Sequence, residues 1–481
     1  MRFERIRSAK LRYGTRIPPM RRTTRLGHAI SNVTVHATVS RSTRGISPMI
    51  VNGRVATCWA SSSRLMPWGN SPVTPSISTG PFVGHQAGRV SYTDVSLPLR
   101  IAQVNAAFDP AAQTPADLLD LFTTLTEWSA AMTRAGAHVT VFQRFRTDAR
   151  IERDGVTYEF VGDGHAPALS TSDAPLAFAH AIAREPADVI HVNGLIFPRL
   201  VAGIRRLAGP QPVMVVQHHG GEFPVRGSGP IGAWRRKRWR DGLLAADAVS
   251  FTAADQAAPW RTAGVLAGQQ VIEIVEAGTT LRSVPRARGR AAAGVSGDPL
   301  ILWVGRLTKN KDPITVLDGL EMALPRLPRA SVVMAFGSTE LLRLVTERVR
   351  SSPVLTERVT LAGNVPHHEL PNYYGAADLF VSGSHSEGSG YALVEAMSAG
   401  LVPVVTDIPS FRVIAGPCGA RWPAGDARAC AAALLEVRAR DAATAREQVT
   451  RHFSRVLHWD AIAAVTLAAY TELRDRKRRP D

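Results

Sequence analysis

The sequence predicts an α/β protein with two Rossmann-like domains, and three observations support this fold class. Residues 379–405 read as one βαβ unit, with an apolar strand, a Gly/Ser turn, a helix that stops at Gly400 and a second apolar strand. Residues 99–142 read as another such unit. Between the two units, short apolar runs alternate with helical or loop segments, which is typical of strands in a parallel sheet.

Composition along the chain predicts five segments. Residues 1–97 form a basic extension without a regular hydrophobic period, and residues 98–284 form the first Rossmann-like domain. Residues 285–298 are rich in Arg, Ala, Pro and Gly and are predicted to be a linker. The second Rossmann-like domain follows at residues 299–455, and residues 456–475 form a C-terminal helix.

The N-terminal extension carries most of the positive charge. Before Leu97 there are fourteen Lys and Arg against Glu4 and Asp94, so this segment supplies +12 of the formal net charge of +17. Its Arg, Ser, Thr, Pro and Gly content predicts disorder. It could be a basic arm for nucleic acid or anionic lipid, a weak targeting segment, or an extension without function. We favour the last and expect no specific nucleic-acid partner, because the segment lacks the interleaved aromatic residues of a single-strand binder.

The first domain is predicted to begin with a buried strand at residues 99–104, a helix at 115–136 and a strand at 139–142. Ligands of such sheets gather beyond the carboxyl ends of the strands, where polar residues are candidate contacts. His191 lies in one such cluster (HVNG) and His218 in another (QHHGGE, residues 217–222). Further strands of this domain are predicted at residues 158–161, 189–192, 213–216, 249–252 and 271–275.

The second domain opens with a strand at residues 300–304, and Gly305, Arg306 and Lys311 follow it directly. Cations at a strand end are suited to hold a diphosphate, Arg by its two-pronged donor and Lys as a compact charge. We rate Lys309 below Lys311 for this role. Two further strands are predicted, at residues 332–337 and 359–362, with Val365 in the loop after the second.

The turn of the central βαβ unit has the properties of an anion site, because its glycines let the backbone approach a ligand and the next helix points N–H groups at it. Glu387 in the turn and Glu395 in the helix would repel a phosphate, so we expect them to accept hydrogen bonds from neutral hydroxyls. The pattern therefore indicates binding of a sugar nucleotide. The positions expected to line the nucleotide part are Gly388, Ser389, Gly390, Tyr391, Glu395 and Gly305.

Glu387 and Glu395, separated by seven residues within SxxEGSGYALVEA, resemble the paired-glutamate signature of glycosyltransferase family 4. The resemblance runs from about Leu99 to the C-terminal helix. Its later half is the more specific, with GRL at residues 305–307 and TDIPS at 406–410. The resemblance implies the GT-B fold, in which two Rossmann-like domains face each other across a cleft and the last helix crosses back to the first domain. It also implies a retaining transferase that uses a nucleotide-diphosphate sugar.

The same resemblance implies roles for the donor-side residues. Arg306 and Lys311 would hold the departing diphosphate together with the turn N–H groups. Glu387 would orient the transferred sugar and Glu395 the ribose, while the loop of Val365 would dock the base through backbone groups. No metal or other cofactor is expected, in agreement with the lack of an Asp-x-Asp pair.

On the acceptor side, the first domain would bind a hydroxyl acceptor, which could be a glycan, a glycolipid or a small molecule. His191 or His218 would contact the acceptor or the sugar. The first turn, residues 109–115, departs from the family's pattern because it lacks a Gly-Gly pair. A metal site on the histidine pair and purely structural histidines are the rival interpretations.

Two other functions fit the same motifs. A sugar-nucleotide epimerase would keep the diphosphate site but need no acceptor. A non-catalytic sugar-nucleotide-binding protein would keep the donor site alone. Fold analogy does not decide among these, because one fold hosts several functions.

Residues 234–240 (WRRKRWR) begin a basic helix whose Trp234 and Trp239 suggest peripheral contact with a membrane, the alternative being a solvated basic face. The sequence contains no apolar run of about 18 residues, so no membrane-spanning helix is expected. Cys58, Cys418 and Cys430 have no metal-binding spacing and are interpreted as reduced thiols. We therefore expect a cytoplasmic protein that works at the inner face of the membrane if the basic helix binds lipid.

Overall fold

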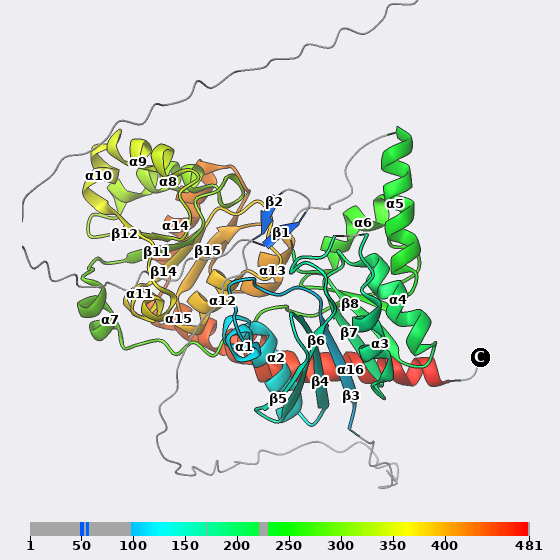
Figure 1. The fold of residues 1–481 in the computed structure, drawn as a ribbon. Helices are drawn as coiled ribbons and strands as arrows, with labels where there is room; N and C mark the ends of the chain where they lie inside the picture. The colour runs from blue at the N-terminus through cyan, green and yellow to red at the C-terminus, as the bar shows by residue number, and fades with distance from the viewer. Residues whose placement is uncertain (1–48, 52–53, 57–97, 171, 221–228, 480–481) are drawn as a thin grey trace, which may run out of the picture. The chain divides into compact units, whose positions relative to one another are not determined.

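The computed structural model describes residues 49–51, 54–56, 98–170, 172–220 and 229–479. The predicted extension at residues 1–97, which includes Cys58, therefore lies almost wholly outside the described residues. Within it, two short strands that the sequence did not predict pair antiparallel, β1 (Met49–Val51) and β2 (Arg54–Ala56). The described residues from Met49 onward belong to one compact unit, which contains two larger sheets (Figure 1).

The first sheet has the strand order β10-β9-β8-β7-β3-β4-β6-β5, and every pair is parallel except β5 with β6. Its long parallel part agrees with the predicted alternation of strands and helices. The antiparallel edge strand β5 was not predicted. The strands are β3 (Arg100–Asn105), β4 (His138–Phe145), β5 (Ala149–Arg153), β6 (Val156–Gly162), β7 (Val189–Asn193), β8 (Val213–Gln217), β9 (Ala248–Phe251) and β10 (Gln270–Glu273).

Helices cover both faces of this sheet, because successive strand residues point to opposite sides. Ile101 of β3 belongs to one buried cluster, with side chains of α1, α2 and α16, whereas Ala102 and Val104 belong to another, with side chains of α3 to α6. The predicted helix 115–136 is two helices, because Phe122 leaves helical geometry between them. The helices are α1 (Pro115–Leu121), α2 (Thr123–Arg134), α3 (Leu176–Arg184), α4 (Pro198–Ala208), α5 (Gly229–Leu243), α6 (Ala258–Thr262) and α16 (Trp459–Arg478), with η1 (Ala254–Ala257) before α6.

The second sheet is wholly parallel, in the order β13-β12-β11-β14-β15-β16. Its strands are β11 (Leu300–Gly305), β12 (Ser331–Phe336), β13 (Val359–Gly363), β14 (Leu379–Ser382), β15 (Val402–Thr406) and β16 (Ala420–Trp422). The accompanying helices are α8 (Pro313–Ala323), α9 (Leu342–Arg350), α10 (Pro353–Arg358), α11 (Leu370–Ala376), α12 (Tyr391–Ser398), α13 (Pro409–Ala415), α14 (Ala427–Ala439) and α15 (Ala442–His452). Short turns of helix are η2 (Lys309–Lys311), η3 (Leu324–Arg326), η4 (His367–Glu369) and η5 (Phe453–Leu457).

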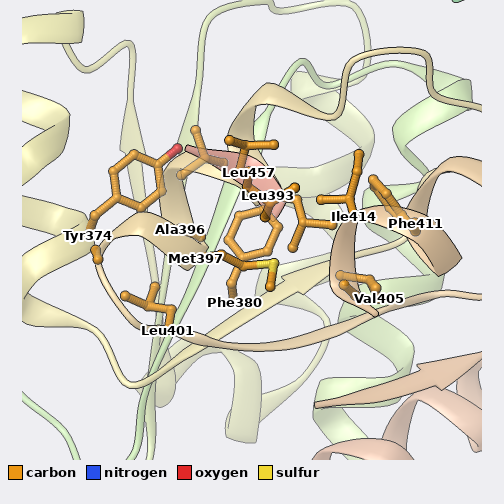
Figure 2. Close-up of a cluster of buried hydrophobic side chains, with 14 of the residues drawn as sticks. Tyr374, Phe380, Leu393, Ala396, Met397, Leu401, Val405, Phe411, Ile414 and Leu457 are labelled. Carbon is orange, nitrogen blue, oxygen red and sulfur yellow. The ribbon is translucent and has the colours of Figure 1, made fainter. Parts of the chain in front are cut away.

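The central βαβ unit has the predicted form, with α12 between β14 and β15. Leu393, Ala396 and Met397 of α12 pack in a buried cluster with Phe380 of β14 and Val405 of β15 (Figure 2). Burial of such side chains contributes about 1.5–3 kcal/mol each. The cluster fixes α12 on its sheet, so the start of this helix is held at the carboxyl end of β14.

Two segments connect the domains of the two sheets, the segment 285–298 and the C-terminal helix α16. The predicted linker 285–298 contains helix α7 (Arg286–Ala293), and Gly289 of this helix lies against the backbone of α11. Helix α16 lies against the first sheet, where Lys477 donates hydrogen bonds to Asp247 and Arg478 to Asp188. Arg134 of α2 also pairs with Asp460. Helix α16 is thus attached to the first Rossmann-like domain.

Candidate active site

The loop between β14 and α12 is a compact turn that needs its glycines. Gly390 has φ +60°, in the left-handed region, and caps α12 without a side-chain hydrogen bond to the first helical turn. A Cβ on Gly390 would also lie 2.7 Å from Cδ1 of Ile414. Since α12 is eight residues long, its N-terminus presents backbone N–H groups at this turn. The turn therefore depends on glycine at position 390, and the first N–H groups of α12 have no acceptor within the helix.

Glu387 of the turn before α12 lies against Lys311 of the loop after β11. The Lys311 ammonium group forms an ion pair with the Glu387 carboxylate, and both side chains are mostly buried. The two loops are also joined by Asn310, whose side chain donates to the Ser386 carbonyl over 2.9 Å. Arg306 follows β11 in the same loop, and its carbonyl accepts from the Thr308 N–H over 2.8 Å. Lys309 is exposed.

Glu395 points from α12 to two protein donors. Its carboxylate accepts hydrogen bonds from the Tyr374 hydroxyl over 2.9 Å and from Nε2 of His367 over 3.0 Å. Burial opposes protonation of His367, but the hydrogen bond and the charge of Glu395, together with Glu127, outweigh it and raise the His367 pKa. His367 follows the loop of buried Val365. A carboxylate with two oxygens can take further hydrogen bonds, so Glu395 retains acceptor capacity.

Glu127 is a neighbour of Glu395 that sequence analysis missed. This α2 residue accepts from the Thr280 hydroxyl over 2.6 Å and from Nε1 of Trp459 over 2.5 Å. Burial is the main cause that raises its pKa, with a smaller contribution from the charge of Glu395. A single Glu on an amphipathic helix gives no signal in one sequence, and only the fold brings it here.

The two predicted histidines lie in the core. His191 is 3% exposed, and its Nε2 donates to Gln217 over 2.8 Å while its Nδ1 accepts from the Tyr470 hydroxyl. His218 packs on Phe251 with ring centroids 4.9 Å apart, and its Nδ1 accepts from the Gly220 N–H over 3.2 Å. Burial lowers the pKa of each to about 4, so both rings are neutral near pH 7.

The structure instead exposes His219, which the sequence analysis did not single out. Its side chain is 41% exposed, and its Nδ1 contacts the carboxylate of buried Glu276. The only sequence signal was its place beside His218 at the end of a strand. Because β8 is buried on both sides, alternation did not tell which of the two rings points outwards.

The loop after β8 reaches the turn before α12. A Cβ on Gly220 would lie 2.6 Å from both N and Cα of Gly388. Gln256 of η1 donates to the Glu387 carbonyl over 2.8 Å, and the Tyr391 hydroxyl donates to Thr124 over 2.8 Å. The loop continues into residues 221–228, which include Glu222 and lie outside the described residues. His219, which precedes Gly220, and the turn before α12 are therefore neighbours.

In the part of the chain that the structure describes, no group of three or more His, Cys, Asp and Glu side chains is arranged to hold a metal ion. Among the same residues, every helix is too short or too polar to cross a bilayer.

Comparison with known families gives two matches. The model described as "Glycosyltransferase Family 4" matches residues 122–272, and the model described as "Glycosyl transferases group 1" matches residues 288–445. Together they cover more than half of the chain. The chain belongs to glycosyltransferase family 4. The resemblance carried by Glu387 and Glu395 is thereby confirmed.

Individual members of the family 4 group show the extent of the likeness. The GDP-mannose:cellobiosyl-diphosphopolyprenol alpha-mannosyltransferase of Xanthomonas oryzae is 28% identical over 253 residues, which are 52% of this chain and 63% of that protein, a little under two thirds. The D-inositol 3-phosphate glycosyltransferase of Mycolicibacterium smegmatis is 26% identical over 435 residues, 81% of this chain and 95% of that protein. The structure of sucrose-phosphate synthase from Thermosynechococcus elongatus superposes with a TM-score of 0.58 at 23% identity, covering 79% of this chain and 100% of the other. This last likeness shows the shared fold, which is GT-B, as predicted.

Proposed function

We propose that this protein is a retaining glycosyltransferase that moves a sugar from a nucleotide-diphosphate sugar to a hydroxyl acceptor, without a metal. The observation that carries the proposal is the Lys311–Glu387 pair beside the glycine turn that opens α12. A cation, a sugar-orienting carboxylate and helix N–H groups meet there. These are the groups that such a transfer requires.

The chemical difficulty is charge separation at the anomeric carbon. As the bond to the diphosphate breaks, the sugar becomes oxocarbenium-like and the leaving group gains negative charge. Lys311, Arg306 and the N–H groups at the start of α12 stabilise that negative charge. Lys311 has three N–H donors, so its pairing with Glu387 leaves donors for phosphate oxygens. Glu387 orients the transferred sugar by accepting from its hydroxyls.

The nucleotide and its surroundings complete the proposed site. Glu395, held by Tyr374 and His367, accepts from the ribose hydroxyls, and the loop of Val365 lies beside the base. The loop of Gly220 lies against the donor turn, and water excluded by such closure would not hydrolyse the donor. The name of the Xanthomonas relative makes GDP-mannose the first donor to test.

The experiment is to incubate the full chain with GDP-mannose, UDP-glucose and ADP-glucose, with and without candidate hydroxyl acceptors. Transfer, or slow hydrolysis with release of the nucleoside diphosphate, supports the proposal, and the anomeric configuration of the product by NMR tests retention. An isomerised donor would instead identify an epimerase. Binding without turnover would identify a non-catalytic sugar-nucleotide-binding protein, and no binding of any donor would refute all three.

We also propose that α5 contacts an anionic membrane surface at the cytoplasmic side. Ile231 and Trp234 on this helix are 69% and 58% exposed, and the Arg238 guanidinium lies 5.5 Å from the Trp234 ring centroid. Trp239 is buried beside Trp260 and anchors the helix. Exposed apolar side chains among clustered cations are suited to lipid headgroups. The cations of the segment are Arg235, Arg236, Lys237, Arg238 and Arg240.

Co-sedimentation with vesicles tests this contact. Changing the five α5 cations to Gln should abolish binding to vesicles that contain phosphatidylglycerol, whereas neutral phosphatidylcholine vesicles should bind neither protein. Unchanged binding would remove the proposal. A matched control neutralises five exposed arginines elsewhere and should bind as the wild type does: Arg343, Arg350, Arg428, Arg451 and Arg455.

A further inference from the structure

His219 and Glu276 form a carboxylate–imidazole pair at the carboxyl edge of the first sheet. His219 follows β8, Glu276 follows β10, and β9 lies between these two strands. Nδ1 of His219 contacts the Glu276 carboxylate. Glu276 is 5% exposed, whereas the His219 side chain is 41% exposed. One half of the pair is therefore fixed in the protein and the other half faces outwards.

The loop that carries Glu276 is held firmly. A Cβ on Gly278 would lie 2.7 Å from Cδ2 of Trp459, so the loop backbone packs directly on the indole. Thr280 donates to Glu127, which also accepts from Trp459. The loop that follows Glu276 is thus held against the start of α16 and α2.

His219 is the residue that contacts the buried Glu276 carboxylate. A buried carboxylate is costly unless it is paired or hydrogen-bonded. His218 is near enough to feel the charge of Glu276, but burial lowers its pKa to about 4, so it does not supply a compensating charge near neutral pH. Oε2 of Glu276 is buried and has no hydrogen-bond partner among the residues that the structure describes. The contact with Nδ1 is therefore the defined interaction of this carboxylate.

The pairing sets the chemistry of the exposed nitrogen. An ionised carboxylate only accepts hydrogen bonds, so the proton of the His219–Glu276 contact resides on Nδ1. Nε2 is then the nitrogen that is presented to a ligand. His219 directly precedes Gly220, which touches Gly388 of the donor turn. Nε2 therefore belongs to the region where the transferred sugar and the attacking hydroxyl would meet.

We propose that Glu276 is a positioning residue that fixes the ring and tautomer of His219 so that Nε2 accepts a hydrogen bond from a substrate hydroxyl. This inference rests on the proposed glycosyl transfer. The hydroxyl belongs either to the acceptor or to the transferred sugar, and both present the same chemistry to Nε2. If the hydroxyl belongs to the transferred sugar, donor binding depends on the His219–Glu276 pair. If it belongs to the acceptor, donor binding does not depend on this pair.

Two substitutions separate positioning from a structural role. Glu276→Gln removes the charge with little change in shape. His219→Asn places an amide N–H near the position of Nδ1, so it keeps a donor for Glu276 while removing Nε2. Each should lower kcat/KM for transfer by about 10–100-fold, the loss found when carboxylates that orient ligating imidazoles are removed. In the His219→Asn background, Glu276→Gln should lower kcat/KM by less than about a further twofold. The reason is that both substitutions disrupt the same interaction between Nε2 and the substrate hydroxyl.

The control variant is Glu273→Gln, at an exposed site three residues upstream of Glu276. The Gln amide oxygen still accepts from the Ala254 N–H, so this variant should retain activity within about twofold.

Calorimetry with the donor identifies which substrate supplies the hydroxyl. Unchanged donor affinity and unchanged donor hydrolysis in Glu276→Gln indicate a hydroxyl of the acceptor, and loss of both indicates a hydroxyl of the transferred sugar. ¹⁵N NMR of the His219 ring should show a proton on Nδ1 in the wild type, and a proton on Nε2 alone would overturn the inference.

Failure of the inference can be told from failure of the proposed function. If the wild type turns over a nucleotide sugar and His219→Asn matches its kcat/KM, the inference is wrong and the transferase proposal stands. If the wild type neither binds nor turns over any donor, the transferase proposal fails and the assignment of Nε2 fails with it. Additive losses in the double variant would also overturn the inference, since they would assign Glu276 a role independent of His219.

Discussion

Gly220 and Gly388 touch backbone to backbone, so that a Cβ on Gly220 would lie 2.6 Å from Cα of Gly388. Real Cβ atoms essentially never approach so closely. The contact joins the loop after β8 to the turn before α12, and the Gln256 hydrogen bond to the Glu387 carbonyl lies at the same place. The close approach of Gly220 is therefore sufficient by itself to require glycine at position 388.

Gly388→Ala should disturb this contact with little effect on either sheet. Inserting a methyl group into a packed site costs about 1–3 kcal/mol, and here separation of the two loops relieves the clash. We expect kcat/KM to fall at least about tenfold, the equivalent of 1.4 kcal/mol, while the melting temperature changes little. Gly203→Ala is the control, because a Cβ there meets nothing within 4 Å. Equal activity of the Gly388→Ala variant and the wild type would show that the contact is dispensable.

Lys311→Met should remove the cation that faces the diphosphate. Loss of one preorganised stabilising group typically costs about 10²–10³ in kcat, and the substitution also leaves Glu387 without its ion-pair partner. Steady-state kinetics of nucleoside diphosphate release measure the effect. Lys309→Met, two residues earlier and exposed, should stay within about twofold of the wild type. Similar losses in both variants would mean that the loop needs general positive charge and not Lys311.

The His367–Glu395 pair predicts a pH-dependent contribution to stability. The pKa of His367 is raised in the folded protein, so its charged form is favoured there. That contribution is fully present below the ordinary value of 6.5 and is lost as the pH rises through the raised folded-state pKa. His367→Gln keeps a donor for Glu395 but no charge. The difference in melting temperature between wild type and variant should therefore be largest near pH 5.5 and shrink toward pH 9.

The control for this titration is His368→Gln, because His368 is the exposed neighbour of His367. Its melting temperature should follow that of the wild type across the same pH range. A His367→Gln difference that stays constant with pH would mean that the pair acts through packing and not through charge.

Tyr470→Phe should destabilise the protein without changing the binding of donor or acceptor. It removes the hydroxyl that donates to Nδ1 of buried His191. Leaving a buried acceptor unsatisfied costs about 1–3 kcal/mol. Chemical denaturation measures the loss. Tyr158→Phe is the matched control, because the buried Tyr158 hydroxyl has no partner among the described residues, so this change should be neutral or stabilising. A raised KM for the acceptor in Tyr470→Phe would instead support a binding role for His191.

The sequence predicted the parallel strands well because their residues are buried on both faces and form continuous apolar runs, as in Leu300–Gly305. It missed Ala149–Arg153 because that edge strand is short and largely exposed. Contact between Lys311 and Glu387, which are 76 residues apart in the chain, could be anticipated because each follows the carboxyl end of a parallel strand. Which histidine is exposed could not be predicted, since His191, His218 and His219 all lie in or just after a strand and differ only in what packs against them. The pairing of Glu276 with His219 became visible only when the fold placed β10 two strands from β8.

The central claim is that the turn before α12, with Lys311 opposite, binds the diphosphate of the donor. Titration calorimetry with a nucleoside diphosphate and the matching monophosphate tests this most directly, beginning with GDP and GMP and repeated with UDP and ADP. One of the diphosphates should bind the wild type at least about tenfold more tightly than its monophosphate, a difference of 1.4 kcal/mol, and Lys311→Met should lose most of that preference. Equal affinity for the two nucleotides, or a preference that survives in Lys311→Met, would contradict the account.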